Sequence, residues 1–415
     1  MKIKRGQRMI PYEQAQHLVL NEARPSGVEK VKIERALGRV VAKDIFARLS
    51  LPPFSNSAVD GYALRSSDTL GAEAGSRLSL KLLAEQRAGV YFSGRLTKGT
   101  ALKVMTGAAV PSGADAVVAR EEVEEKDGQI FIHRPIKVGE NIRLAGEDVK
   151  RGEKIIEAGT ELLPAHLGLL AACGQREVWV YRQPRVYVIV TGDELCPAGK
   201  PLKKGMIYDA NSFLIRALVE KSGARLVALR RIKDRLETLE KCLKEALAKA
   251  EIILTSGGVS VGDYDLVKEA AENIGGERIF WQVAQKPAKP LAFYKIKKNN
   301  SRVYLFGLPG NPGAVFISFL EYIQPFIRKM MGRKNYLPEE IEATLTHPVR
   351  KKRGRLNFLR VKLQPRVNEW LATSAGAQES GILSSLTRTQ GLALIPAEAE
   401  FLEAGTKIKV HLIDQ

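Results

Sequence analysis

The chain has 415 residues, of which 45% are hydrophobic and 27% charged, so its composition excludes a disordered chain and suggests about two to four globular domains. The formal net charge of +19 favours anionic partners. The three cysteines, Cys173, Cys196 and Cys242, form no C-x-x-C pair, which argues against structural zinc and a disulfide framework. We see no signal-peptide core and no long apolar stretch, and we expect a cytoplasmic protein with neither a membrane nor a nucleic acid as partner.

The first 183 residues predict short elements of mixed type. Residues 10–23 are expected to form a helix that begins near a proline, and residues 51–64, rich in Pro, Ser, Asn and Gly, a loop. Residues 75–150 contain short alternating runs separated by glycines, which are typical of a small β-rich domain. Residues 163–174 predict a second helix, closed by Gly174.

From Pro184 onward, apolar strands alternate regularly with helices. Because the strands are apolar on both faces, this pattern predicts a parallel, doubly wound α/β sheet wrapped by helices. One of the helices is expected to be capped by Asn211 or Ser212 and closed by Gly223. After about residue 333 the strands become short again, which predicts a separate small β domain.

Three glycine-bearing loops follow strands of the predicted sheet, with the sequences TGDEL, TSGGVSVGDYD and LPGNPG. Since parallel strands end at one edge, these loops are expected to gather there and to direct backbone N–H groups at an anion. Glu194 and Asp265 lie in the first two loops, and carboxylates beside a phosphate site often hold Mg²⁺.

Two lysines lie between these loops in the segment KPAKP. Pro287 and Pro290 restrict the backbone around Lys286 and Lys289, which favours two fixed positive charges. An exposed charged loop explains the same residues about equally well. The basic run RKKRGR at 350–355 is interpreted as a solvated turn.

Ser260 fits the G-x-S-x-G spacing of a hydrolase nucleophile, but a nucleophilic serine needs a histidine base. His347 and His411 follow it in the chain, and neither lies in a sequence typical of a base-bearing loop. We therefore interpret Ser260 as a hydrogen-bond donor to an oxyanion.

An ordered set of motifs covers nearly the whole chain: PPFSNSAVDGYAL, VMTGAAVPSGADAVV, GENIRLAGEDVKRGE, VTGDEL, GMIYDANS, LTSGGVSVGDYD, KPAKP, GLPGNPG and SGILSSL. This set resembles the MoeA-type molybdopterin molybdenumtransferases, the family that includes the C-terminal domain of gephyrin. The ordered set is far more specific than any one of its motifs.

The resemblance implies an elongated homodimer of mixed α/β, multidomain subunits. Domain III is implied to be the doubly wound α/β molybdopterin-binding domain, domain II a β-rich insert and domain IV a β-barrel. The expected boundaries are 1–50 with 149–183 for domain I, 51–148 for domain II, 184–332 for domain III and 333–415 for domain IV.

The implied reaction inserts molybdenum from molybdate into the dithiolene of adenylylated molybdopterin and releases AMP, with Mg²⁺ as cofactor. A molybdopterin adenylyltransferase is a candidate partner. The alternatives are a sensor or scaffold paralogue that binds molybdopterin or molybdate without turnover, and a transferase that prefers tungsten.

The resemblance also assigns roles to residues, and Asp60 and Thr106 are expected to face the domain III site of the partner subunit. The expected catalytic residues are Asp60, Thr106, Glu194 and Asp265. Metal ligands are expected at Asp265, Glu194 and Asp148. Substrate-binding residues are expected at Ser260, Gly257, Gly258, Lys286, Lys289, Pro290, Asn311, Arg360, Arg355, Ser380 and Ser384.

Three positions depart from the family pattern. Ala288 replaces a usual glycine in KPAKP, so the lysine segment is open to a different placement. Ala314 replaces a usual serine, which removes a hydroxyl contact to molybdate, and Ser55 replaces a usual aspartate. None removes a core charged residue, so we expect activity and leave the preference between molybdate and tungstate open.

Overall fold

The computed structural model describes residues 9–73, 78–258, 266–298 and 301–413. The chain forms two compact units, which are described separately. Unit 1 comprises Met1–Glu29, Gly38–Ala42 and Tyr181–Gln415, and unit 2 comprises Lys30–Leu37 and Lys43–Val180.

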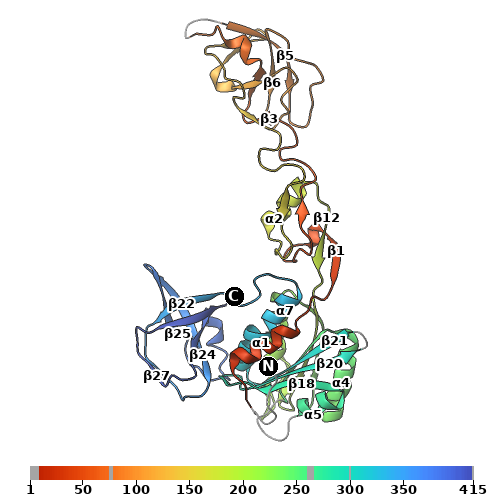
Figure 1. The fold of residues 1–415 in the computed structure, drawn as a ribbon, viewed down its shortest axis with the longest axis vertical. Coiled ribbons are helices and arrows are strands. Elements are labelled where there is room, and N and C mark those ends of the chain that lie inside the picture. The colour runs from red at the N-terminus through yellow and green to blue at the C-terminus, as the bar shows by residue number, and fades with distance from the viewer. Residues whose placement is uncertain (1–8, 74–77, 259–265, 299–300, 414–415) are drawn as a thin grey trace. The chain divides into compact units, whose positions relative to one another are not determined.

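Unit 2 is built on a six-stranded sheet with the order β7-β4-β6-β5-β9-β8. Two of its strands, β5 and β6, are labelled in Figure 1. All four residues of β4 are buried, and the sheet packs around Tyr62, Leu64 and Val118. The strands are β4 (Gly61–Leu64), β5 (Leu78–Gln86), β6 (Thr100–Val104), β7 (Ala116–Ala119), β8 (Glu124–Lys126) and β9 (Gln129–Ile132).

Short strand pairs and one helix complete this part of the chain. The pairs are β1–β12, β2–β11 and β3–β10. The bounds are β1 (Val28–Lys32), β2 (Ile45–Phe46), β3 (Asn56–Ser57), β10 (Ile142–Arg143), β11 (Lys154–Ile156), β12 (Glu177–Tyr181) and α2 (Pro164–Ala172), with 3-10 turns at Ile33–Arg35, Ser66–Thr69 and Arg120–Glu122.

Unit 1 contains a second six-stranded sheet with the order β16-β13-β17-β21-β20-β18. The first four strands are parallel, whereas β20 and β18 are antiparallel to their neighbours. Successive residues of β13 enter opposite cores, Val188 on one face and Ile189 on the other. The strands are β13 (Arg185–Thr191), β16 (Arg225–Ile232), β17 (Ile252–Ser256), β18 (Gly276–Gln282), β20 (Pro290–Lys298) and β21 (Ser301–Leu308), with the short pair β14 (Leu195–Cys196) and β15 (Ile207–Tyr208).

Helices cover both faces of this sheet, as strands buried on both faces, such as β13 and β17, require. Residues of α4 and α5 pack with Ile189, while α1, α3 and the long helical segment after β21 pack with Val188. That segment contains a π-helical turn, and α1 lies beside its last part, α7 (Figure 1). The helices are α1 (Tyr12–Glu22), α3 (Asn211–Lys221), α4 (Leu236–Lys249), α5 (Leu266–Asn273), α6 (Pro312–Ser318), the π-helix Phe319–Ile323 and α7 (Gln324–Met330).

The C-terminal strands close into a five-stranded barrel, β24-β25-β22-β28-β26, because β26 pairs back onto β24. The short strand β19 from the α/β region pairs parallel with the start of β24. The bounds are β19 (Gln285–Lys286), β22 (Glu340–Leu345), β23 (Val349–Arg350), β24 (Leu356–Arg366), β25 (Glu369–Ser374), β26 (Gly391–Ile395), β27 (Phe401–Leu402) and β28 (Lys407–Leu412), with a 3-10 turn at Leu386–Arg388.

The mixed α/β, multidomain fold with a C-terminal β-barrel is confirmed, whereas the four domain boundaries stay predictions. The α/β sheet, predicted to be parallel, is mixed, because β18 and β20 run antiparallel to their neighbours. Two local expectations were also wrong. The predicted loop at 51–64 contains β3 and the buried strand β4, because its apolar end satisfies its backbone within the sheet. Asp209, and not Asn211 or Ser212, caps α3: its Oδ1 accepts a hydrogen bond from the Ser212 backbone N–H at 2.9 Å.

Candidate functional site

Three neighbouring parallel strands end at the same level of the α/β sheet. Val190 lies opposite Ser256, and Ser256 lies opposite Leu308, so the loops that follow β13, β17 and β21 begin together. Gly257 has a φ of +87° and packs so closely that a Cβ there would lie 2.3 Å from the carbonyl oxygen of Thr191. A Cβ on Gly310 would lie 3.9 Å from the Cα of Gly257. The predicted convergence of the three loops is therefore present in their described residues.

The side chain of Asn211 joins two of these loops. Its Nδ2 donates hydrogen bonds to Ser256 Oγ at 2.9 Å and to the carbonyl oxygen of Gly310 at 2.7 Å. The sequence pattern predicts a capping role for Asn211 and gives no sign of its hydrogen bonds to Ser256 and Gly310. A buried amide can bridge two distant loops only once the sheet has brought them together.

The third loop also contacts the barrel. The Gly313 backbone N–H donates to the carbonyl oxygen of Ser380 at 2.8 Å, and Asn311 Nδ2 donates to Ser380 Oγ at 2.9 Å. A Cβ on Gly313 would lie 3.1 Å from Nη1 of Arg360 and 2.9 Å from the Ser380 carbonyl oxygen. Three of the predicted substrate-binding residues, Asn311, Arg360 and Ser380, thus lie together at the start of α6.

Arg360 is 1% exposed. Its guanidinium is held by backbone carbonyls of residues 375–385, the loop after β25 that carries Ser380 and Ser384 and is called the serine loop. It donates to the carbonyl oxygens of Ala377 at 2.9 Å, Glu379 at 3.0 Å and Ile382 at 3.2 Å. Burial lowers the pKa of Arg360, and the nearby Glu379 opposes that shift. Arg360 therefore shapes the loop that carries Ser380, and its direct contact with substrate stays a prediction.

Two further predicted substrate-binding residues, Arg355 and Ser384, belong to the barrel region. Arg355 is half-buried directly before β24, and Ser384 is exposed. The roles of both in substrate binding stay predictions.

The segment 283–289 forms a turn that contains Lys286 and Lys289 and is called the lysine turn. It lies at the same edge of the sheet as the LPGNPG loop. β20 begins at Pro290 and runs antiparallel to β21 with Ala292 opposite Gly307, so the residues before Pro290 lie beyond the end of β21. Lys286 is exposed and Lys289 is half-buried. The expectation that these lysines lie near the glycine loops therefore agrees with the strand register.

Ala288 adopts a left-handed conformation, with a φ of +66°, and is 4% exposed. This conformation costs an L-residue about 1–2 kcal/mol and costs glycine little. The structure thus gives a physical reason for a glycine at this position and shows the strain that the alanine carries.

The structure describes only two of the three carboxylates that are expected to hold a metal. Glu194 is exposed, and a Cβ on Gly192 would lie 2.8 Å from its Oε2, so its carboxylate lies over its own loop. Ser260 and Asp265 lie outside the described residues. Asp148 is exposed and belongs to unit 2. Within the described part of the chain, no three His, Cys, Asp or Glu side chains are grouped so that they could hold a metal ion.

In unit 2 the structure brings Asp60 and Thr106 together. Asp60 Oδ1 accepts hydrogen bonds from the backbone N–H and the Oγ1 of Thr106, both at 2.7 Å. Both hydrogen bonds lower the pKa of Asp60, and the bond from the backbone N–H has the larger effect. The antiparallel pairing of β4 with β6 places the two residues side by side although they are far apart in sequence.

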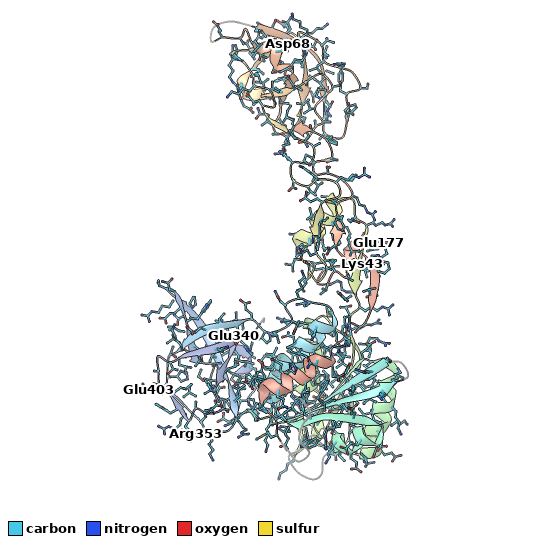
Figure 2. The ribbon with its side chains drawn as sticks, in the orientation of Figure 1. Lys43, Asp68, Glu177, Glu340, Arg353 and Glu403 are labelled. Carbon is cyan, nitrogen blue, oxygen red and sulfur yellow. The ribbon has the colours of Figure 1, made fainter. Side chains whose placement is uncertain are left out.

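The basic run at 350–355 is largely engaged within the barrel. Lys351 Nζ donates to the carbonyl oxygens of Arg355 at 3.0 Å and Ala397 at 3.1 Å, and the guanidinium of Arg350 lies 5.0 Å from the ring centre of Phe401. Arg353, labelled in Figure 2, lies 3.4 Å from Glu400. These contacts explain the run as a part of the barrel's own structure.

The chain matches the MoeA N-terminal region (domain I and II) over residues 10–174, a probable molybdopterin binding domain over 187–329 and the MoeA C-terminal region (domain IV) over 342–413. It is 36% identical over 410 residues to a molybdopterin molybdenumtransferase of Haemophilus influenzae, covering 97% of this chain and 98% of that protein. The chain belongs to the MoeA family. It is therefore an enzyme of molybdenum cofactor biosynthesis.

Other MoeA-family members agree with this assignment. A molybdopterin molybdenumtransferase of Staphylococcus aureus is 33% identical over 407 residues, which cover 98% of this chain and 96% of the relative. A crystal structure of the molybdopterin biosynthesis MoeA protein of Pyrococcus horikoshii has a TM-score of 0.82 at 32% identity, covering 97% of this chain and 99% of that one. In the part of this MoeA-family chain that the structure describes, no helix is long and apolar enough to span a membrane.

Proposed function

We propose that the protein inserts molybdenum from molybdate into the dithiolene of adenylylated molybdopterin and releases AMP. The observation that carries this proposal is the meeting of the lysine turn, the start of α6 and the serine loop at the edge where the glycine loops end. Molybdate is a dianion and needs fixed cations and hydrogen-bond donors, which Lys286, Lys289 and Ser380 would supply there.

The adenylylated pterin would lie against the glycine loops. Gly257 and Gly258 have φ values of +87° and +66°, and a backbone of this kind presents N–H groups to phosphate oxygens. Asn211 supports this surface, because it ties the end of β17 to Gly310.

A divalent cation is proposed at the same edge. Mg²⁺ takes few protein ligands and keeps several waters, so one exposed carboxylate beside a phosphate loop, as at Glu194, fits its requirements. Glu194 and Asp265 would hold it, and Asp148, which belongs to unit 2, stays a separate proposal for a metal ligand. When bound, the ion would neutralise charge on the phosphoanhydride.

The metal role is tested by substitution. We expect Glu194→Gln and Asp265→Asn to abolish the dependence of AMP release on added Mg²⁺ together with most of the activity. Full AMP release by Asp265→Asn with Mg²⁺ present would show that this carboxylate has no role in metal binding.

We also propose a homodimer in which Asp60 and Thr106 act at the α/β domain of the partner subunit. Unit 2 leaves the apolar side chains of Phe46, Leu49 and Leu163 each about half exposed, which supports an interface there. Mixing the impaired Asp60→Asn and Glu194→Gln proteins is expected to raise activity above that of either variant alone, because a mixed dimer contains one intact site. No recovery after subunit exchange, demonstrated by differently tagged chains, would contradict the shared site.

The reaction itself is tested by incubating the purified protein with adenylylated molybdopterin, molybdate and Mg²⁺. We expect AMP release that depends on molybdate. Binding of both substrates without AMP release would instead favour the sensor or scaffold alternative. Repeating the assay with tungstate, and with Ala314→Ser, tests whether the absent hydroxyl on this buried residue sets the oxyanion preference.

Two further proposals concern the protein's surroundings. The adenylylated substrate must be made by another enzyme, so a molybdopterin adenylyltransferase is proposed as a partner, and co-purification of tagged chains tests it. We propose a cytoplasmic location, which fractionation of cells that express the protein would test.

A further inference from the structure

The lysine turn is closed around the buried amide side chain of Gln285. The Val283 backbone N–H donates to the carbonyl oxygen of Lys289 at 3.0 Å, which closes the turn. Gln285 is fully buried inside it, and its Nε2 donates to the carbonyl oxygen of Ala288 at 3.2 Å. The residue that this amide holds is the one in the left-handed conformation.

A buried tyrosine fixes the orientation of that amide. The hydroxyl of Tyr322 donates a hydrogen bond to Gln285 Oε1. Burial, with the charge of Glu321, raises the pKa of Tyr322, so the hydroxyl keeps its proton and acts as the donor. Because Oε1 accepts this bond, Nε2 must be the atom that faces Ala288.

The support behind Tyr322 is rigid. Tyr322 lies in the π-helix Phe319–Ile323, all five residues of which are buried. Its ring packs edge-on against Tyr12 at 5.7 Å between ring centroids, and the Tyr12 hydroxyl donates to Glu321 at 2.7 Å. The position of the tyrosine hydroxyl is therefore set by the core and not by the turn.

We propose that Gln285 and Tyr322 are positioning residues for the oxyanion substrate. They hold Ala288 in its left-handed conformation and thereby set the directions of Lys286 and Lys289, which lie on either side of it in the turn. This inference rests on the proposed function, because it assigns the two lysines to oxyanion binding. A glycine at position 288 would need less of this support, since glycine adopts the conformation without strain.

The test compares oxyanion binding by the full-length protein and its Tyr322→Phe variant. Molybdate affinity is measured by calorimetry in the presence of adenylylated molybdopterin, alongside KM and kcat for AMP release. We expect Tyr322→Phe to raise Kd and KM for molybdate by about tenfold with little change in kcat. Gln285→Met, which keeps the side-chain length and loses the amide, is expected to have a similar or larger effect.

Tyr304→Phe is the matched control. Tyr304 is also buried in unit 1, and its hydroxyl donates a hydrogen bond to the carbonyl oxygen of Glu22 at 2.8 Å, away from the turn. The control is expected to lower the melting temperature about as much as Tyr322→Phe does while leaving the molybdate Kd unchanged. Equal changes of Kd in the two variants would overturn the positioning role.

Ala288→Gly provides a second test. If Tyr322 only stabilised the fold, this substitution would not change the effect of Tyr322→Phe on molybdate binding. In that background we expect Tyr322→Phe to weaken molybdate binding by much less than in the native background. An equal loss in both backgrounds would overturn the inference. If the native protein bound no molybdate, the proposed function would fail and the inference with it, whereas native binding with an unaffected Tyr322→Phe variant would overturn the inference alone.

Discussion

The buried carboxylate of Glu321 lies 2.9 Å from the ring Nδ1 of His411. Glu321 belongs to the π-helix of the α/β region, and His411 belongs to β28 of the barrel, so the pair joins the two parts of unit 1. Glu321 is fully buried, and Tyr12 donates a second hydrogen bond to it. A charge at this depth is tolerated because it is paired and hydrogen-bonded.

This pair predicts a pH-dependent stability of unit 1. Burial lowers the pKa of His411. The hydrogen bond and charge of Glu321, together with the charge of Glu340, raise this pKa by more, so the net shift is upward. Lys409 opposes that shift, and Tyr12 donates to Glu321. The folded state therefore binds the proton more tightly than the unfolded chain does. The stabilisation is complete below the unfolded pKa of about 6.5 and is lost as pH rises through the higher folded value.

Thermal unfolding measured from about pH 5.5 to pH 9 checks this prediction. The native protein is expected to lose stability across the upper part of that range, whereas His411→Gln is expected to show a flatter profile. Because removing one member of a buried pair typically costs about 3–5 kcal/mol, the variant should also be less stable at low pH. Parallel profiles for the two proteins would contradict the prediction.

Asn211→Leu is expected to loosen the edge of the sheet. The change removes the amide donor from the exposed Gly310 carbonyl oxygen and from the buried hydroxyl of Ser256, and the buried acceptor that loses its donor costs about 1–3 kcal/mol. Denaturant unfolding measures this loss, and AMP release should fall with it because two substrate loops separate. Unchanged stability would mean that water replaces the amide.

Gly313→Ala tests the contact between α6 and the serine loop. The new methyl would meet the Ser380 carbonyl oxygen at 2.9 Å, so the loop must shift, at a cost of about 1–3 kcal/mol, and molybdate binding should weaken. Gly168→Ala in α2 is the control, because nothing lies within 4 Å of its Cβ position. The control is expected to be neutral or to stabilise by about 0.5–1 kcal/mol. Similar losses in both variants would argue against a specific contact.

Asp60→Asn is expected to lower AMP release by about tenfold or more while unit 2 stays folded, since the amide keeps an acceptor for Thr106 and loses the charge. Because the hydrogen bonds from Thr106 lower the pKa of Asp60, its carboxylate should stay ionised to a lower pH than that of an ordinary aspartate. Asp68→Asn is the matched control: Asp68, labelled in Figure 2, also accepts a backbone N–H, from Gly99 at 2.8 Å. A similar decrease of AMP release in both variants would contradict a specific role of Asp60 in the reaction.

The amino-acid sequence by itself determined the kinds of element and the edge at which the site would lie. Apolar runs such as 186–190 predict strands buried on both faces, which are typical of parallel sheets between helices, although β20 is buried in this way and runs antiparallel. Because parallel strands share one direction, the glycine loops had to emerge together. Periodicity and chain direction are local properties, so they can be read from the chain alone.

Only the tertiary structure decided which side chains meet. The contacts of Asn211 with Gly310, of Gln285 with Tyr322 and of Glu321 with His411 join residues that are far apart along the chain. Each depends on strand register or on the packing of a helix against the barrel, and no local pattern encodes either. Burial also changed the interpretation of Arg360, because a guanidinium enclosed by carbonyl groups shapes its loop before it can meet a substrate.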